Sequence, residues 1–526
     1  MNNSDLEKLV ADISKNDVIP ISPAEALAQI KIFEKGIPFL KLVKSCAIGD
    51  GIKIIPEDQH DLYINKFHSV LSKGRVVKFV PASGAATRMF KRQMAVLNKN
   101  DDVTLERIEQ CASNDDEDCK ETLLFINNIK RFAFYDELKN SLKSKGKNLD
   151  NLLTDCKVDE VLHSVVSEDG LDYSNLPKGC ILFHGYPDGS RTAFEEHLVE
   201  AMNYSSDENK VIKIHFTISS EHESQIKKLF RSLEEKYKKE GWTFDVQFSF
   251  QSPSTDTISV TTDNKPFRDN EGKIVFRPGG HGALLKNLDE LKADIVSIKN
   301  IDNVVPDYLK EETYKYKKIL VGYLIVIQEK IFNYISELEN NQTDDKTISE
   351  IIQFIKEEID VDLQNNLNDK SLQEKQKFLL KYLYRPIRVC GMVKKEEHPG
   401  GGPFWVESEN GEISKQIVES AQIDMSDANQ KRIYNEATHF NPVDIVCGVK
   451  DFKASPFQLN KFANPDTGLI VKKSKDGREL KALELPGLWN GGMYHWLTIF
   501  VEVPKITFNP VKEVNDLLRP EHQPKN

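Results

Sequence analysis

The stretch Val76-Val-Lys-Phe-Val-Pro-Ala-Ser-Gly-Ala-Ala-Thr-Arg88 decides the fold class of this chain. Its first five residues are β-branched or aromatic apart from one lysine, which is typical of a short strand. The run ends at Pro81, and the small residues that follow predict a tight loop that leads into a helix. In open α/β sheets, ligands bind at such strand-to-helix junctions.

The loop from Ser83 to Arg88 has the chemistry of an anion site. Small residues such as Ser83, Gly84, Ala85 and Thr87 let backbone N–H groups approach a phosphate at the start of a helix. Arg88 adds a permanent charge with two parallel donors. An ordinary turn between a strand and a helix has the same composition, and the Walker motif GxxxxGK[ST] does not occur in the chain. The residues alone therefore leave both a phosphate loop and a plain turn open.

Strand and helix patterns alternate after this loop. Strands are predicted at 180–183, 211–217, 244–250 and 295–301, with helices at about 192–203 and 221–240. Such alternation predicts a layered α/β domain. Two helical stretches, at about 92–170 and 307–382, interrupt it as inserts, the second with long helices at 311–338 and 348–384. The segment 386–518 returns to strands and turns.

The first 70 residues are predicted to form a helical extension in front of a domain that spans 71–526. Ser22 suits a helix N-cap, Pro23 the first helical position and Glu25 the third. Apolar residues then recur at helical spacing.

The charge and hydropathy of the chain exclude several classes of protein. Its 71 Lys and Arg residues stand against 82 Asp and Glu residues, a net charge of -11, which argues against a nucleic-acid surface. The longest apolar run, Ile319–Ile327, is far shorter than the roughly 20 residues of a membrane span. Because no basic and apolar leader precedes the domain, a cytoplasmic protein is expected.

The seven cysteines are scattered along the chain and form no CxxC pair. Neither a disulfide framework nor a zinc site is indicated by such spacing, so free thiols are expected.

Further motifs follow the loop in a fixed order. A strand ends at Gln251, the turn Phe276-Arg-Pro-Gly-Gly-His-Gly-Ala-Leu-Leu285 comes next, and Ile298-Lys-Asn-Ile-Asp-Asn303 closes another strand. In this order the motifs resemble the uridylyltransferase branch of the sugar nucleotidyltransferases, the UDP-glucose and UDP-N-acetylglucosamine pyrophosphorylases. The resemblance implies that Gln251 reads the base, that Gly279, Gly280 and His281 lie against the nucleotide, and that Asp302 binds the metal.

The C-terminal segment adds two more motifs of the same kind. Phe508-Asn-Pro-Val-Lys-Glu-Val-Asn-Asp-Leu-Leu518 is similar to the pyrophosphorylase segment whose lysine contacts phosphate, which implies that role for Lys512. Leu483-Glu-Leu-Pro-Gly-Leu-Trp-Asn-Gly-Gly-Met493 resembles the sugar-binding segment and implies that Glu484, Asn490 and Gly491 hold the sugar. Pro177-Lys178 matches the Pro-Lys pair of the family. The whole chain also resembles an uncharacterised bacterial family of unknown function.

This resemblance implies a fold and a reaction. The fold is a three-layer α/β/α nucleotide-sugar transferase domain, GT-A-like and Rossmann-like, with a mixed sheet. The reaction joins a nucleoside triphosphate, UTP by preference, to a sugar-1-phosphate with Mg²⁺ and releases pyrophosphate. Arg88, Lys178 and Lys512 are the expected catalytic cations. Two alternatives stay open: a non-catalytic nucleotide or nucleotide-sugar sensor, and another transferase on the same fold, such as a cytidylyltransferase or a glycosyltransferase.

Overall fold

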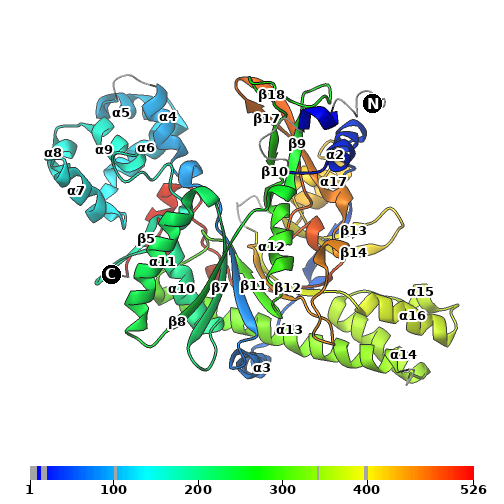
Figure 1. Ribbon diagram of the computed structural model, residues 1–526. Coiled ribbons are helices and arrows are strands. Elements are labelled where there is room, and N and C mark those ends of the chain that lie inside the picture. Colours follow the sequence, from blue (N-terminus) through cyan, green and yellow to red (C-terminus); the bar gives the residue numbers. More distant parts are fainter. Residues whose placement is uncertain (1–8, 14–19, 100–102, 341–342, 396–400, 526) are drawn as a thin grey trace.

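The computed structural model describes residues 9–13, 20–99, 103–340, 343–395 and 401–525. Its elements form a mixed α/β fold around one large sheet, with a helical lobe on one side and smaller sheets on the other (Figure 1). The predicted α/β class is confirmed.

The large sheet has the strand order β2-β3-β19-β12-β16-β11-β4-β7-β8. Along this path β16 is antiparallel to both neighbours, and the other pairs are parallel, so the sheet is mixed as predicted. Four of the predicted strands lie in it as β4, β7, β8 and β11. The bounds are β2 (Ala47–Ile48), β3 (Gly51–Lys53), β19 (Leu497–Glu502), β12 (Ile387–Lys394), β16 (Asp444–Gly448), β11 (Ile295–Lys299), β4 (Val76–Pro81), β7 (Val211–Ile218) and β8 (Thr243–Phe250).

The centre of the sheet determines where the candidate site lies. β11 is buried along its whole length, which is typical of a strand covered on both faces. It is parallel to β4, with Ile295 opposite Val76 and Ile298 opposite Phe79. Because adjacent parallel strands end at the same edge, the loops after β4 and β11 emerge side by side.

The long helix α13 (Lys310–Glu339) packs against the sheet and against α3 (His60–Leu71). The crossing is so close that a Cβ on Gly322 would lie 1.9 Å from the carbonyl oxygen of Tyr63. The segment 307–339 is long and apolar enough to cross a membrane, and 61% of its most apolar window is buried inside the protein. Burial in the core accounts for this hydropathy.

A helical lobe occupies the predicted insert at 92–170 and stands apart from the sheet in Figure 1. Its helices begin at capping residues such as Thr104, Asp116 and Asn148, whose side chains accept backbone N–H groups of the first turn. The helices are α4 (Lys91–Lys99), α5 (Leu105–Ser113), α6 (Glu117–Asn127), α7 (Tyr135–Ser144), α8 (Leu149–Thr154) and α9 (Val158–Val166).

The prediction that every cysteine is a free thiol is wrong for two of them. Cys111 on α5 and Cys119 on α6 form a disulfide, with Cα atoms 5.8 Å apart. The chain reverses direction between the helices at Asp115, whose backbone is left-handed (φ 70°), and so brings the two thiols together. The other five cysteines are free, as predicted.

Reduction of this disulfide is expected to lower the stability of the helical lobe by roughly 2–3 kcal/mol, because the cross-link closes a short loop in the unfolded chain. Urea unfolding with and without a reducing agent measures the effect. The double variant C111S/C119S is the control. It should unfold at the same urea concentration as the reduced protein, and the reducing agent should not shift its transition. A wild-type transition that does not move on reduction would argue against the cross-link.

The predicted helical segment up to residue 70 is wrong in part. α2 (Pro23–Lys35) begins with the expected capping box, in which Ser22 Oγ accepts the N–H of Glu25 and the Glu25 carboxylate accepts the N–H of Ser22. The chain then forms β1 (Lys41–Ser45), β2 and β3 before α3. β1 pairs with β13 (Gly402–Glu407) and β3 with β19, so strands from the far end of the chain impose these conformations.

Two further predictions need correction. The helix predicted at 348–384 is divided into α14 (Asp345–Phe354), a π-turn (Ile355–Ile359), α15 (Gln364–Leu367) and α16 (Leu372–Leu383), because Asp360 has a left-handed backbone. The strand predicted at 180–183 is β5 (Leu182–Tyr186), which forms a separate hairpin with β6 (Gly189–Thr192). The helix predicted at 311–338 is α13 and is confirmed.

The remaining elements surround the sheet. α10 (Ala193–Tyr204) packs on β7, and α11 (Glu223–Lys238) on β8. A four-stranded sheet has the order β10-β9-β18-β17, and a three-stranded sheet the order β1-β13-β14. Their bounds, with those of the short strand and helices nearby, are β9 (Asp256–Val260), β10 (Phe276–Pro278), β14 (Ile413–Val418), β15 (His439–Phe440), β17 (Leu469–Lys475), β18 (Arg478–Glu484), α12 (Leu284–Glu290) and α17 (Ala428–Asn435).

Candidate functional site

Lys178 and Asp302 form an ion pair that joins two segments far apart in the sequence. Lys178 Nζ lies 2.8 Å from Asp302 Oδ2. The backbone N–H of Lys178 donates to the carbonyl oxygen of Gly84 at 3.1 Å, and Ala85 forms a β-bridge with Pro177. The loop after β4, the Pro-Lys pair and the end of β11 therefore meet at one edge of the sheet.

Asp302 also lines a pocket of about 360 Å³, here called the Asp302 pocket. Lys512 lines the same pocket. Its backbone N–H donates to Asp516 Oδ2 at 2.6 Å, and its side chain is exposed without an ion pair in the described residues. The wall is completed by Asn300, Gly401, Glu419, Ser420, Tyr434, Phe440, Asn441, Pro442, Val443, Trp489, Phe508 and Pro510.

The C-terminal segment holds Lys512 in place. Val511 N donates to the carbonyl oxygen of Asp302 at 3.0 Å, and Val514 N donates to Met89 O at 3.0 Å. Asn515 Nδ2 donates to Glu121 Oε2 in the helical lobe at 2.6 Å. The backbone around Lys512 is thus fixed to the end of β11 on one side and to the lobe on the other.

The predicted phosphate loop is exposed at Ser83, Gly84, Ala85, Thr87 and Arg88. The hydroxyl of Thr87 donates to the carbonyl oxygen of Ser174 at 2.8 Å, so this side chain maintains the shape of the loop. The guanidinium of Arg88 has no partner in the described residues. The loop does not enter a helix directly: a 3₁₀ turn (Ala86–Arg88) comes before α4.

His281 connects the predicted nucleotide turn to the Asp302 pocket. Its ring stacks on Trp489 with 4.3 Å between centroids, and Nδ1 accepts the N–H of Leu488 at 3.2 Å. Burial lowers the pKa of His281, and Glu419 and Glu484 oppose this effect. The lowered pKa favours the neutral ring.

The glycines of this turn permit a close approach to the segment after β18. A Cβ on Gly279 would lie 2.5 Å from the carbonyl oxygen of Thr255, and one on Gly282 would lie 2.4 Å from that of Pro486. Gly280 has a left-handed backbone (φ 71°). A side chain at Gly279 would clash with Thr255 and Leu485, and one at Gly282 with Leu485 and Pro486.

Gln251 follows β8, and its Nε2 atom is buried without a hydrogen-bond partner in the described residues. An unsatisfied buried donor costs about 1–3 kcal/mol. A ligand acceptor, such as a carbonyl oxygen of a base, would satisfy it.

The three predicted sugar residues have different positions. Asn490 is buried, and its Nδ2 donates to Glu419 Oε1 at 3.1 Å and to Gln422 Oε1 at 3.2 Å. Gly491 packs behind it, where a Cβ would lie 1.6 Å from Thr467 Oγ1. Glu484 ends β18, 3.8 Å from Lys473 Nζ, and is not part of the pocket wall. Only Asn490 reaches the wall, through Glu419.

Asp302 is the only predicted metal ligand. Its Oδ2 pairs with Lys178, and its Oδ1 makes no hydrogen bond or ion pair with the residues that the structure describes. Mg²⁺ is usually held by one or two carboxylates together with phosphate oxygens and water, so Asp302 fits such an ion once a phosphate ligand is present. In the described part of the chain, one group of three metal-ligating side chains occurs, Cys111, Asp116 and Cys119, and its cysteines form the disulfide.

Sequence reasoning missed Glu419 and Trp489. Glu419 directly follows the buried strand β14, and a carboxylate at a strand end facing a ligand edge is a signal that could have identified it. Trp489 lies inside the quoted segment 483–493, next to Asn490.

Comparisons with known proteins cover nearly the whole chain. The UDP-glucose pyrophosphorylase of Leishmania major is 12% identical, with 98% of this chain and 79% of that chain covered and a TM-score of 0.45. The UDP-N-acetylglucosamine pyrophosphorylase of Trypanosoma brucei is 13% identical with the same coverage and a TM-score of 0.47. No curated protein matches the chain. Residues 9–523 match the model of one family, and the chain therefore belongs to the family described as Domain of unknown function (DUF4301).

Proposed function

We propose that this protein is a nucleotidyltransferase that forms an NDP-sugar and pyrophosphate from a nucleoside triphosphate, UTP by preference, and a sugar-1-phosphate. The observation that carries the proposal is the convergence of Lys178, Asp302 and Lys512 at the edge of the sheet where the loop after β4 also lies. Two lysines, a carboxylate and an unpaired arginine at one edge suit a reaction between two polyanions.

The chemistry assigns a role to each charged group. An oxygen of the sugar-1-phosphate attacks the α-phosphorus of the triphosphate, the bond to the bridging oxygen breaks, and pyrophosphate leaves. Such a reaction needs positioning and charge neutralisation rather than a strong base. Arg88 and the loop from Ser83 to Thr87 hold the departing phosphates. Lys178 and Lys512 neutralise the charge that develops at the α-phosphoryl group.

Gln251 and Glu419 are assigned to recognition of the base and of the sugar. Gln251 donates its unsatisfied Nε2 hydrogen to the base. Glu419, held by Asn490, faces the Asp302 pocket and accepts hydrogen bonds from sugar hydroxyls. A Mg²⁺ ion at Asp302 would neutralise phosphate charge. The corresponding fold is a GT-A-like, three-layer α/β/α domain, and we place the reaction in the cytoplasm.

The substitution Asp302→Asn tests this assignment. It keeps the size of the side chain but removes its charge, so pyrophosphate release should fall by roughly 10²–10³-fold, the loss typical of a group that stabilises transition-state charge. UTP binding without metal, measured by calorimetry, should persist. Asp245→Asn on the edge strand β8 is the matched control and should be fully active.

Full turnover in Asp302→Asn would overturn the assignment of this residue. UTP binding without pyrophosphate release in the wild-type protein would instead identify a sensor.

A further inference from the structure

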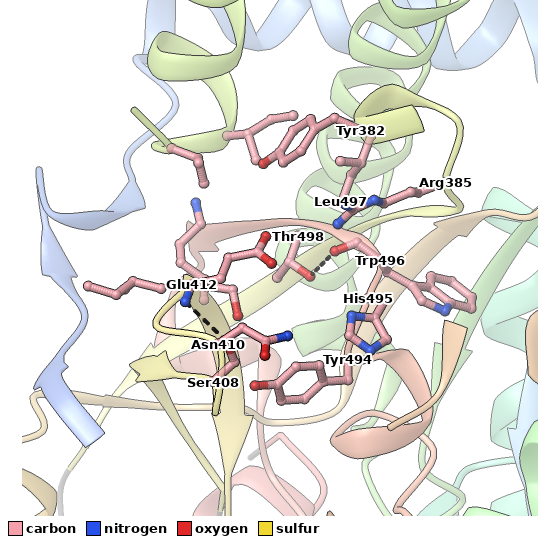
Figure 2. A pocket seen from close by; sticks show the side chains of 15 residues that line it. Tyr382, Arg385, Ser408, Asn410, Glu412, Tyr494, His495, Trp496, Leu497 and Thr498 are labelled. Atoms are coloured by element: carbon pink, nitrogen blue, oxygen red, sulfur yellow. Dashed lines mark hydrogen bonds between the residues drawn. The ribbon is translucent and has the colours of Figure 1, made fainter. Parts of the chain in front are cut away.

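A second pocket shares no wall residue with the Asp302 pocket. It lies where the end of α16, the β13–β14 hairpin and the start of β19 meet (Figure 2). Its volume is about 100 Å³, enough for a small ion and a few water molecules but not for a nucleotide. The pocket is therefore a separate site for a small ligand.

Two donors on one side of this second pocket lack partners. Tyr382 is only 6% exposed, yet its hydroxyl makes no hydrogen bond in the described part of the chain. The guanidinium of Arg385 lies over the Tyr382 ring at 4.7 Å and forms no ion pair there. In Figure 2 both side chains border the cavity from the α16 side. The Tyr382 hydroxyl is accessible to solvent although the ring is buried, so it is free to donate to a ligand acceptor in the pocket.

The opposite side of the pocket carries acceptors and amides. Glu412 and Asn410 lie on the β13–β14 hairpin, together with Ser408 (Figure 2). The Glu412 carboxylate forms no ion pair with Arg385 across the pocket. A ligand that accepts hydrogen bonds from Arg385 and donates one to Glu412 would bridge the gap.

A buried cation lies directly beside the pocket. Arg388 on β12 is fully buried, and its Nε donates to Oγ1 of Thr498, a residue of the pocket wall, at 2.9 Å. Its Nη1 donates to the carbonyl oxygen of Trp489, and its Nη2 has no partner in the described residues. Among the described residues no carboxylate pairs with this guanidinium, and an uncompensated buried charge is unfavourable. A nearby anion would offset part of that cost.

The other cation of the wall is already neutralised. Lys415 is buried and forms an ion pair with Asp360. The wall therefore carries Arg385 and the field of Arg388 against the single exposed carboxylate of Glu412, a net positive balance.

We propose that the second pocket binds a phosphate group, either inorganic phosphate or a small phosphomonoester. The planar guanidinium of Arg385 matches two phosphate oxygens, and the Tyr382 hydroxyl donates to a third. A protonated phosphate oxygen donates to Glu412. The carbonyl bond of Arg388 to Trp489 connects this site to the Asp302 pocket, so phosphate is expected to change the affinity for UTP.

Calorimetry with inorganic phosphate and with glycerol phosphate tests the proposal, with chloride at equal ionic strength as the blank. The wild-type protein should bind one of them, Arg385→Gln at least 10-fold more weakly and Tyr382→Phe several-fold more weakly. Lys381→Gln, an exposed lysine of α16, is the matched control and should bind like wild type. The better of the two probes identifies the source of the phosphate.

Binding that is lost in Lys512→Ala but unchanged in Arg385→Gln would place the phosphate in the Asp302 pocket and overturn the proposal, as would an absence of binding. These phosphate-binding measurements need no turnover, so their outcome does not depend on the proposed function. The connection to UTP rests on that function: a UTP affinity that phosphate leaves unchanged in the wild-type protein would overturn the connection alone.

Discussion

Replacement of Lys512 by alanine is expected to lower pyrophosphate release by roughly 10²–10³-fold, the loss typical of removing one group that stabilises transition-state charge. The lysine lines the Asp302 pocket with an exposed ammonium group that pairs with no carboxylate in the described residues. Its backbone is held by Asp516, and the neighbouring Val511 is bonded to Asp302, so truncation of the side chain leaves these contacts in place. The melting temperature should therefore stay unchanged.

Steady-state assays over a range of nucleotide and sugar-phosphate concentrations measure both kcat and KM. Lys346→Ala, an exposed lysine on α14, removes the same charge far along the chain and should keep full activity. A higher KM with an unchanged kcat would show that Lys512 contributes to substrate binding but does not act specifically on the transition state. Wild-type values of both kcat and KM in Lys512→Ala would remove it from the site.

The largest expected effect on stability is that of Glu200→Gln. Glu200 on α10 is fully buried, and its two oxygens lie 2.9 Å from Lys78 Nζ and 2.8 Å from Lys299 Nζ. Lys78 belongs to β4 and Lys299 to β11, the two strands that carry the site loops. One carboxylate thus serves as the shared counterion of two buried lysines beneath the site.

Loss of this charge is expected to cost about 3–5 kcal/mol, because it leaves buried cations without compensation. Burial already lowers the pKa of Lys78 to about 7, although Glu200 opposes that effect. Without Glu200, the pKa of Lys78 should fall further, and the lysine should lose its proton in the folded protein. Urea unfolding of the variant measures the cost.

Glu223→Gln is the matched control for this measurement. Glu223 forms an exposed pair with Lys227 one turn along α11, and such pairs contribute only about 0.3–0.5 kcal/mol. A loss for Glu200→Gln no larger than that of this control would contradict the role of Glu200 as the shared counterion.

The elements that sequence reasoning predicted well are those that their own residues determine. β4, β7, β8 and β11 are short apolar runs, and α13 has a continuous apolar pattern, so local periodicity is sufficient. β1 and β3 were wrongly predicted as helix. Their conformation depends on pairing with β13 and β19, which lie more than half the chain away. No local pattern contains that information. The disulfide was missed for a related reason, since it depends on how α5 and α6 pack.

The candidate site divides in the same way. Motif order identified Lys178, Asp302 and Lys512, and the structure brings them together, although their chemical roles stay predictions. Glu484 was assigned from its motif; it ends β18 and does not line the Asp302 pocket, and its role stays a prediction. Glu419, which directly follows β14, lines this pocket. Which glutamate lines the pocket depends on the three-dimensional arrangement and could not be read from the motif alone.

The most direct test of the central claim is pyrophosphate release by the wild-type protein, with Mg²⁺, over all pairs of the four nucleoside triphosphates and a panel of sugar-1-phosphates. The account predicts release for UTP with at least one sugar-1-phosphate, and none when either substrate is omitted. Silence for every pair, with no binding of UTP or of a UDP-sugar, would contradict it.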